Sequence, residues 1–132
     1  MKPLQDSETD TDGGFSMVKT KDKIVIFFPL ASADPHTSDA LTRDLRELAS
    51  SVTSGKQQLR VVGHADNSGT PTLNLRYGQQ RADAIKRILV EFGVPEGNIS
   101  AESKGETEPV ASNETEEGRK KNRRVEVIRL KN

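Results

Sequence analysis

The sequence contains no cysteine, no tryptophan and one tyrosine among its 132 residues. Without cysteine the chain can form neither disulfide bonds nor thiolate sites, and with two histidines a structural zinc site is not expected. Aromatic residues make up 4% of the chain, which argues against surfaces that stack nucleic-acid bases or sugars. A ligand is therefore expected to be held by charges and hydrogen bonds, with no metal and no other cofactor.

An excess of charge and long apolar runs are also missing. Lys and Arg together number 20, as do Asp and Glu, so no overall field favours nucleic acid or an anionic membrane. No run approaches the roughly twenty apolar residues of a membrane-spanning helix, and residues 1–6 lack the apolar core of a signal peptide. We therefore expect either a protein that stays where it is made, or a domain whose leader or anchor lies elsewhere in a longer protein.

The composition changes near the beginning of the chain. Residues 1–16 are polar and rich in Asp, Thr and Gly, which predicts a flexible leader or linker. Residues 17–132 have the length of a single domain, and they are expected to fold around one core.

Short apolar runs predict strands at 23–28, 59–63, 99–104 and 124–130. Between them, leucine and valine at helical spacing predict a helix over 38–53, for which Asp34-Pro35 offers a start. A second helix is expected from Thr70-Pro71 to Gly93, and one helical turn near 114–121. The order predicts an α/β fold with two main helices packed on a mixed sheet of about four strands.

An acid and an arginine are expected at one end of this sheet. Asp66 lies in a loop flanked by Gly63 and Gly69, between a strand and the second helix, where α/β proteins commonly bind ligands. Arg81 shares the inward face of that helix with Asn74 and Tyr77, and the same face continues into apolar residues. Because an unpaired buried charge is costly, Arg81 needs an acid, a carbonyl or a ligand.

Two interpretations follow from the spacing alone. Asp66 and Arg81 can hold a zwitterion, with the carboxylate of Asp66 taking an ammonium and the guanidinium of Arg81 taking a carboxylate. Alternatively, Asp66 caps the helix or pairs with Arg81, and Asn74 is a capping or turn residue. The residues themselves leave both interpretations open.

Two separated segments of the sequence carry a specific pattern of residues. The first contains Gly63-His-Ala-Asp-Asn-Ser-Gly69, Asn74, Arg81-Ala82, Leu89 and Gly93-Val94. The second contains Gly105-Glu106, Pro109, Ala111, Asn113, Thr115, Gly118-Arg119 and the run from Asn122 to Glu126. Together these segments resemble the OmpA-like domain found at the C-terminal ends of OmpA, Pal and MotB, and the resemblance covers roughly residues 22–130.

This resemblance implies a periplasmic domain that binds peptidoglycan non-covalently through the diaminopimelate of the stem peptide. It assigns the ligand's ammonium to Asp66 and its carboxylate to Arg81, and it places Asn74 and Arg123 in or at the edge of the same pocket. We add Tyr77 as a ligand-binding candidate. The domain itself would not enter the membrane, although the full-length protein would be membrane-anchored.

Some residues depart from the family pattern. Tyr77-Gly78 stands where Leu-Ser is usual, Ala65 replaces a common Thr, and Phe28-Pro29-Leu30 replaces a stretch that often carries an acidic or polar residue. These differences motivate an alternative, in which the domain has lost wall binding and docks a protein partner in the envelope.

Two further features are given structural interpretations. His64 lies beside Asp66 and raises the idea of a wall-active hydrolase, but no nucleophile or orienting group accompanies it, so we expect a structural hydrogen bond and no enzyme. The run 119–124 has five basic residues, but the zero net charge disfavours nucleic acid. We expect Arg119 and Arg124 to brace the last strand while Arg123 reaches the pocket.

Overall fold

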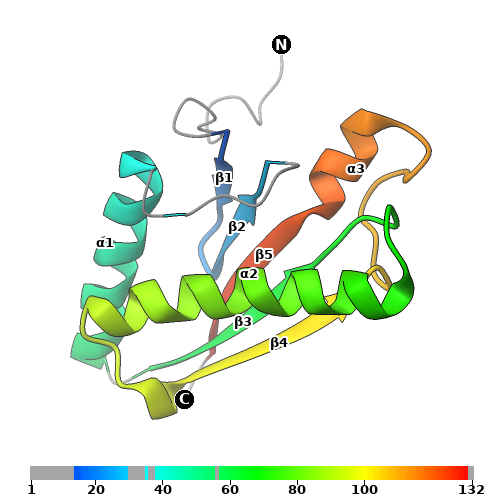
Figure 1. Cartoon of the computed structure of the whole chain (residues 1–132). Helices are drawn as coiled ribbons and strands as arrows, with labels where there is room; N and C mark the ends of the chain where they lie inside the picture. The colour runs from blue at the N-terminus through cyan, green and yellow to red at the C-terminus, as the bar shows by residue number, and fades with distance from the viewer. Residues whose placement is uncertain (1–13, 30–34, 36–37, 56, 131–132) are drawn as a thin grey trace.

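Five strands form one mixed sheet in the order β1-β2-β5-β3-β4 (Figure 1). The computed structural model describes residues 14–29, 35, 38–55 and 57–130. The strands are β1 (Ser16–Lys19), β2 (Lys23–Phe27), β3 (Gln58–His64), β4 (Ile99–Gly105) and β5 (Arg124–Leu130). Only the β3–β4 pair is parallel among these strands, and the other three pairs are antiparallel. The α/β fold with a mixed sheet is confirmed, with one strand more than predicted.

The additional strand is β1, at the end of the segment predicted to be a leader. Most of that segment lies outside the described residues, but Phe15 is 1% exposed and Ser16 begins β1. The ring of Phe15 packs edge-on against Phe28, with 5.0 Å between the ring centroids. The folded domain therefore begins before residue 17, so the predicted boundary after residue 16 is too late.

In the described part of the chain, three α-helices and the short 3-10 helix η3 connect the strands. They are α1 (Asp39–Gly55), α2 (Pro71–Glu91), η3 (Glu96–Asn98) and α3 (Glu116–Asn122). Thr70 and Thr115 cap α2 and α3 through their hydroxyl groups. The backbone N–H of Leu41 donates to the hydroxyl of Ser38 at 3.1 Å, so Ser38 caps α1. The start predicted at Asp34-Pro35 involves Asp34, which lies outside the described residues.

The core lies between the sheet and the helices α1 and α2. In Figure 1, α2 runs across β3 and β4, and α1 stands on the side of β1. The leucines that predicted α1 are buried there, with Leu41 and Leu45 at 0% exposure, and α2 contributes Ile85, Ile88 and Leu89. Each fully buried side chain of this size contributes roughly 1.5–3 kcal/mol to folding.

Two glycines bring α2 unusually close to β3. A Cβ atom on Gly63 would overlap the carbonyl oxygen of Gly78, and a Cβ on Gly78 would collide with the hydroxyl of Ser103. Close packing therefore favours glycine at position 78, which explains one departure from the family pattern, the Gly78 that stands where Ser is usual. The contact fixes the first half of α2 over the end of β3, where the candidate site lies.

In the part of the chain that the structure describes, none of the helices combines the length and the apolar content that crossing a membrane requires.

Candidate functional site

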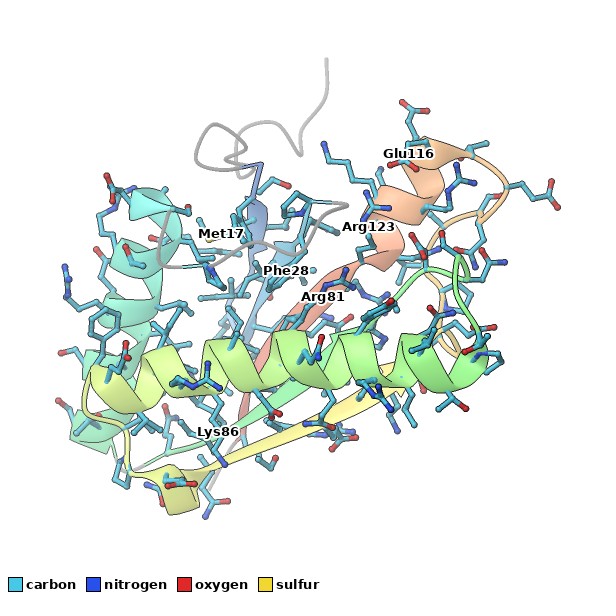
Figure 2. The ribbon with its side chains drawn as sticks, viewed as in Figure 1. Met17, Phe28, Arg81, Lys86, Glu116 and Arg123 are labelled. Carbon is cyan, nitrogen blue, oxygen red and sulfur yellow. The ribbon has the colours of Figure 1, made fainter. Side chains whose placement is uncertain are left out.

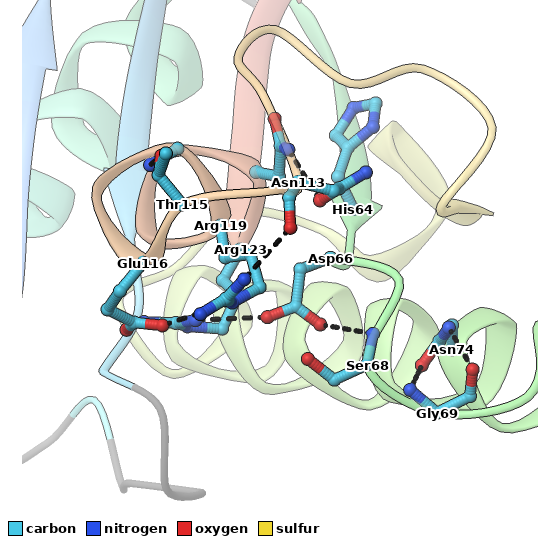
Figure 3. A network of polar contacts seen from close by, with 12 residues as sticks. His64, Asp66, Ser68, Gly69, Asn74, Asn113, Thr115, Glu116, Arg119 and Arg123 are labelled. Carbon is cyan, nitrogen blue, oxygen red and sulfur yellow. Dashed lines mark hydrogen bonds and ion pairs between the residues drawn. The ribbon is translucent and has the colours of Figure 1, made fainter.

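Asp66 is held in the turn between β3 and α2. Its Oδ1 accepts a hydrogen bond from the backbone N–H of Ser68 at 2.9 Å, and its Oδ2 accepts one from Nη1 of Arg123 at 3.0 Å (Figure 3). Burial alone would raise the pKa of Asp66, but these bonds outweigh it and hold the pKa below its ordinary value. The side chain is therefore an ionised carboxylate, although only 5% of the residue is exposed.

Arg123 follows α3 and links two carboxylates. Its Nη1 donates to Asp66, and its Nη2 donates to Oε2 of Glu116 at 3.1 Å. Figure 3 shows the guanidinium between these two acids. The Nε–H group is buried and has no hydrogen-bond partner among the described residues. Arg123 thus reaches the site as expected, and it is Arg123 that pairs with Asp66.

Arg81 extends from α2 toward the same place (Figure 2). Its Nη1 lies 3.4 Å from the carbonyl oxygen of His64, and its guanidinium lies 5.6 Å from the centroid of the Phe28 ring. Within the described residues it has no ion pair with a carboxylate. Burial, followed by repulsion from Arg123, lowers the pKa of Arg81. The direct pairing of Asp66 with Arg81, one of the two interpretations that the spacing left open, is absent there, and Arg81 keeps donors for an acceptor from outside.

A pocket of about 440 Å³ lies between these groups. Its volume falls in the range typical of small-ligand sites, about 300–1,000 Å³. It is lined by Phe28, Ala65, Asp66, Ser68, Asn74, Tyr77, Gln80, Arg81, Ala84 and Arg123. All five residues that the sequence analysis named therefore meet at one cavity.

Asn74 and Tyr77 line this pocket in different ways. Asn74 is 1% exposed. Its amide exchanges hydrogen bonds with the backbone of Gly69 and donates to Glu106 at 2.6 Å, so both of its amide N–H groups are used. Tyr77 is 42% exposed and stands at the rim. Asn74 therefore fixes the loop, whereas Tyr77 is accessible to a ligand.

Several residues at the site were not predicted. Ser68 could have been, because an Asp that accepts from the N–H two residues later is a common turn signal. Gln80, which no pattern in the sequence linked to the site, is also part of the pocket wall. No pattern in the sequence indicated that Glu116 belongs to the site, because its link to the site is the contact with the side chain of Arg123.

His64 does not line the pocket, and its environment argues against acid–base work there. The residue is 2% exposed, and its Nε2 lies 3.9 Å from a carboxylate oxygen of Glu126. Burial, followed by the charge of Arg124, lowers the pKa of His64 to about 4, so the ring is neutral near pH 7. The expected structural hydrogen bond is not found, because Nδ1 has no partner among the described residues and 3.9 Å is too long for one from Nε2.

The basic run over 119–124 is largely used inside the domain. Arg119 donates to the backbone oxygen of Asn113 at 2.9 Å, and Arg124 donates to Glu126 at 2.8 Å and to the backbone of the preceding loop. With Arg123 occupied in the pocket, two exposed lysines remain from the run. This distribution agrees with the bracing role expected for Arg119 and Arg124. The described residues also contain no cluster of three or more side chains suited to a metal ion.

The fold and the site together define an α/β domain with a pocket lined by opposite charges. The OmpA family model matches residues 36–123. The chain is 32% identical to "Probable lipoprotein YiaD" of Escherichia coli (strain K12), over 86% of this chain and 54% of that protein. The chain belongs to the OmpA family.

Solved structures agree with this assignment. The crystal structure of the peptidoglycan-associated lipoprotein from Burkholderia pseudomallei has 29% identity and a TM-score of 0.73, covering 80% of this chain and 89% of that one. The cell wall anchor of the T6SS from Pseudomonas aeruginosa has 31% identity and a TM-score of 0.66, covering 89% and 88%. The chain spans between 21% and 54% of the lengths of three curated relatives, so it corresponds to one part of such proteins.

Proposed function

We propose that this domain binds peptidoglycan non-covalently, through the free amino-acid end of diaminopimelate in the stem peptide. The observation that carries the proposal is the opposition of Asp66 to Arg81 and Arg123 around one pocket. An amino-acid end presents an ammonium and a carboxylate on one carbon. Asp66 would accept the ammonium, while Arg81, which has no carboxylate partner among the described residues, would bind the carboxylate.

The relatives support the biological role. Two solved structures similar to this chain are those of a peptidoglycan-associated lipoprotein and of the cell wall anchor of a T6SS. We therefore propose that the domain works in the periplasm and ties an envelope protein, itself membrane-anchored outside this domain, to the cell wall. Binding without a catalytic step is sufficient, because the wall repeats its stem peptides densely and a tethered domain rebinds quickly.

The two alternatives have weaker support. The interaction-module alternative rested partly on Gly78, which the close contact with Gly63 now explains. The hydrolase alternative rested on His64, which is buried, neutral and outside the pocket wall. Neither alternative is supported by a structural feature comparable to the charged pocket.

Co-sedimentation with purified sacculi tests the proposal. Arg81→Ala should abolish retention on sacculi, because it removes the donors assigned to the ligand carboxylate. Arg76→Ala is a matched control, since Arg76 is an exposed residue of the same helix. Competition with the tripeptide L-Ala-γ-D-Glu-meso-diaminopimelate should release the wild-type chain. Retention of Arg81→Ala at the wild-type level, with both chains folded, would remove the pocket from the explanation.

A further inference from the structure

The charges on the pocket wall do not balance. Asp66 contributes one negative charge, whereas Arg81 and Arg123 contribute two positive charges. The amino-acid end of the proposed ligand brings one charge of each sign, so it leaves this excess unchanged. A pocket with a surplus positive charge would prefer a ligand that has the carboxylate but lacks the ammonium.

Glu116, whose Oε1 also pairs with Nε of Arg119 at 3.2 Å, supplies the missing negative charge from outside the pocket wall. Its Oε2 lies 3.1 Å from Nη2 of Arg123, and 57% of its side chain is exposed, compared with 4% for Arg123. The contact with Arg123 lowers the pKa of Glu116, so it is ionised. Exposed ion pairs of this kind add little to stability. The contact therefore matters because it offsets the charge of Arg123 and fixes the orientation of its guanidinium.

The orientation matters because of the donors that Glu116 occupies. Nε and Nη2 form the edge of a guanidinium that binds a carboxylate with two parallel hydrogen bonds. Arg60 of this chain uses these two atoms to hold Glu102, at 3.1 and 2.9 Å. In Arg123, Nε has no partner and Nη2 is taken by Glu116. Without Glu116, Nη2 of Arg123 would lose its acceptor and be open to an anion, whereas Nε would stay buried.

We infer that Glu116 sets the charge selectivity of the pocket. It neutralises Arg123 and occupies Nη2, so the pocket accepts an amino-acid end of zero net charge and disfavours the same end without its ammonium. Glu116 is a positioning residue, because it acts through Arg123 and is not part of the pocket wall. The identity of the preferred ligand rests on the proposed function.

The test compares Glu116→Gln with Glu117→Gln. Both residues lie in the first turn of α3, and both substitutions remove one exposed negative charge, but Glu117 has no ion pair with Arg123 among the described residues. Calorimetry measures binding of two probes, L-Ala-γ-D-Glu-meso-diaminopimelate and the same tripeptide with 2-aminopimelate as the third residue. The second probe lacks only the distal ammonium.

Glu116→Gln should raise the affinity for the aminopimelate tripeptide about fivefold or more, as expected for removal of a nearby repulsive charge. Its affinity for the diaminopimelate tripeptide should stay within about twofold of wild type, because that end carries no net charge. Glu117→Gln should resemble wild type, and Glu116→Asp should keep the wild-type order of affinities. Equal shifts for both probes, or equal behaviour of the two glutamine variants, would overturn the inference.

A third probe separates this inference from the proposed function. Free pimelate is a dicarboxylate without an amino group, and it should bind Glu116→Gln more tightly than wild type or Glu117→Gln. If no chain binds the diaminopimelate tripeptide, the proposed function is wrong, whereas tighter pimelate binding by Glu116→Gln still supports the role of Glu116. Equal pimelate binding by all three chains contradicts that role.

Discussion

Nη1 of Arg123 and Oδ2 of Asp66 lie 3.0 Å apart, and the two side chains are 4% and 7% exposed. The residues are separated by 57 positions in the sequence. Their ion pair joins the turn after β3 to the junction of α3 and β5, so it connects the two segments that carry the family pattern. The same pair orients the acid that we assign to the ligand ammonium.

Replacing Asp66 with Asn should destabilise the domain by roughly 3 kcal/mol, because it leaves the buried Arg123 without one of its two carboxylates. The folded-state pKa of Asp66 is lowered, so its stabilising effect exists above its ordinary pKa and disappears as the pH falls below about 4. Urea unfolding from pH 7 to pH 2.5 should therefore show a wild-type advantage that shrinks in the acid range.

Asp83→Asn is the control for this measurement. Asp83 is an exposed residue of α2 that accepts a hydrogen bond from Gln79 at 3.0 Å, so its substitution should change the free energy of unfolding by less than about 0.5 kcal/mol. A difference between wild type and Asp66→Asn that stays constant down to pH 2.5 would show that the carboxylate of Asp66 is not stabilised by folding.

Much of this fold could be predicted from local patterns. Strong alternation identified β5 at its observed bounds, and the spacing of Leu41, Leu45 and Leu48 identified α1. β1 was missed because it has four residues and follows a polar segment, so only its pairing with β2 shows that it is a strand. Gln58 and His64 extend β3 beyond its apolar run for the same reason, since non-local pairing defines its ends.

The site was predicted as a set of residues, but its pairing was not. Helical periodicity brought Asn74, Tyr77 and Arg81 to one face, and loop position added Asp66. Which arginine meets Asp66 depends on how α3 and β5 return to the sheet, and no local pattern contains that information. Arg123 pairs with Asp66, whereas Arg81 contacts the backbone carbonyl of His64 and the ring of Phe28.

The neutral, buried His64 should make stability depend on pH near the ordinary histidine range. Its folded-state pKa of about 4 lies below its ordinary value of 6.5, so between these values the unfolded chain binds more protons. The stability is then complete above pH 6.5 and is lost as the pH falls toward 4. Urea unfolding of wild type should show this loss, and His64→Gln should show a smaller slope. An unchanged slope in the variant would mean that His64 does not titrate as its burial implies.

The contact between Gly63 and Gly78 should tolerate no side chain. Gly63→Ala places a methyl group on the backbone oxygen of Gly78, and a helix backbone cannot move aside as a flexible side chain can. The expected cost is about 2–3 kcal/mol, typical of overpacking, with weaker tripeptide binding because α2 must shift.

Gly97→Ala is the matched control for Gly63→Ala, since an added Cβ there meets nothing within 4 Å. Urea unfolding compares the two variants. Similar midpoints for both would contradict the close approach of α2 to β3.

Asn74 could position the Asp66 loop or contact the ligand directly, and the family resemblance does not distinguish these two roles. Its amide N–H groups are already donated to Gly69 and Glu106, so we expect it to position the Asp66 loop and not to contact the ligand. Asn74→Ala should therefore lower stability by about 2 kcal/mol, since it removes the two hydrogen bonds that Asn74 exchanges with Gly69 and the one it donates to Glu106, and tripeptide affinity should fall with it. Glu106→Ala removes the contact to Glu106 alone and should have a smaller effect on both quantities. If Asn74→Ala weakened binding while its unfolding midpoint stayed at the wild-type value, a direct contact between Asn74 and the ligand would be the better explanation.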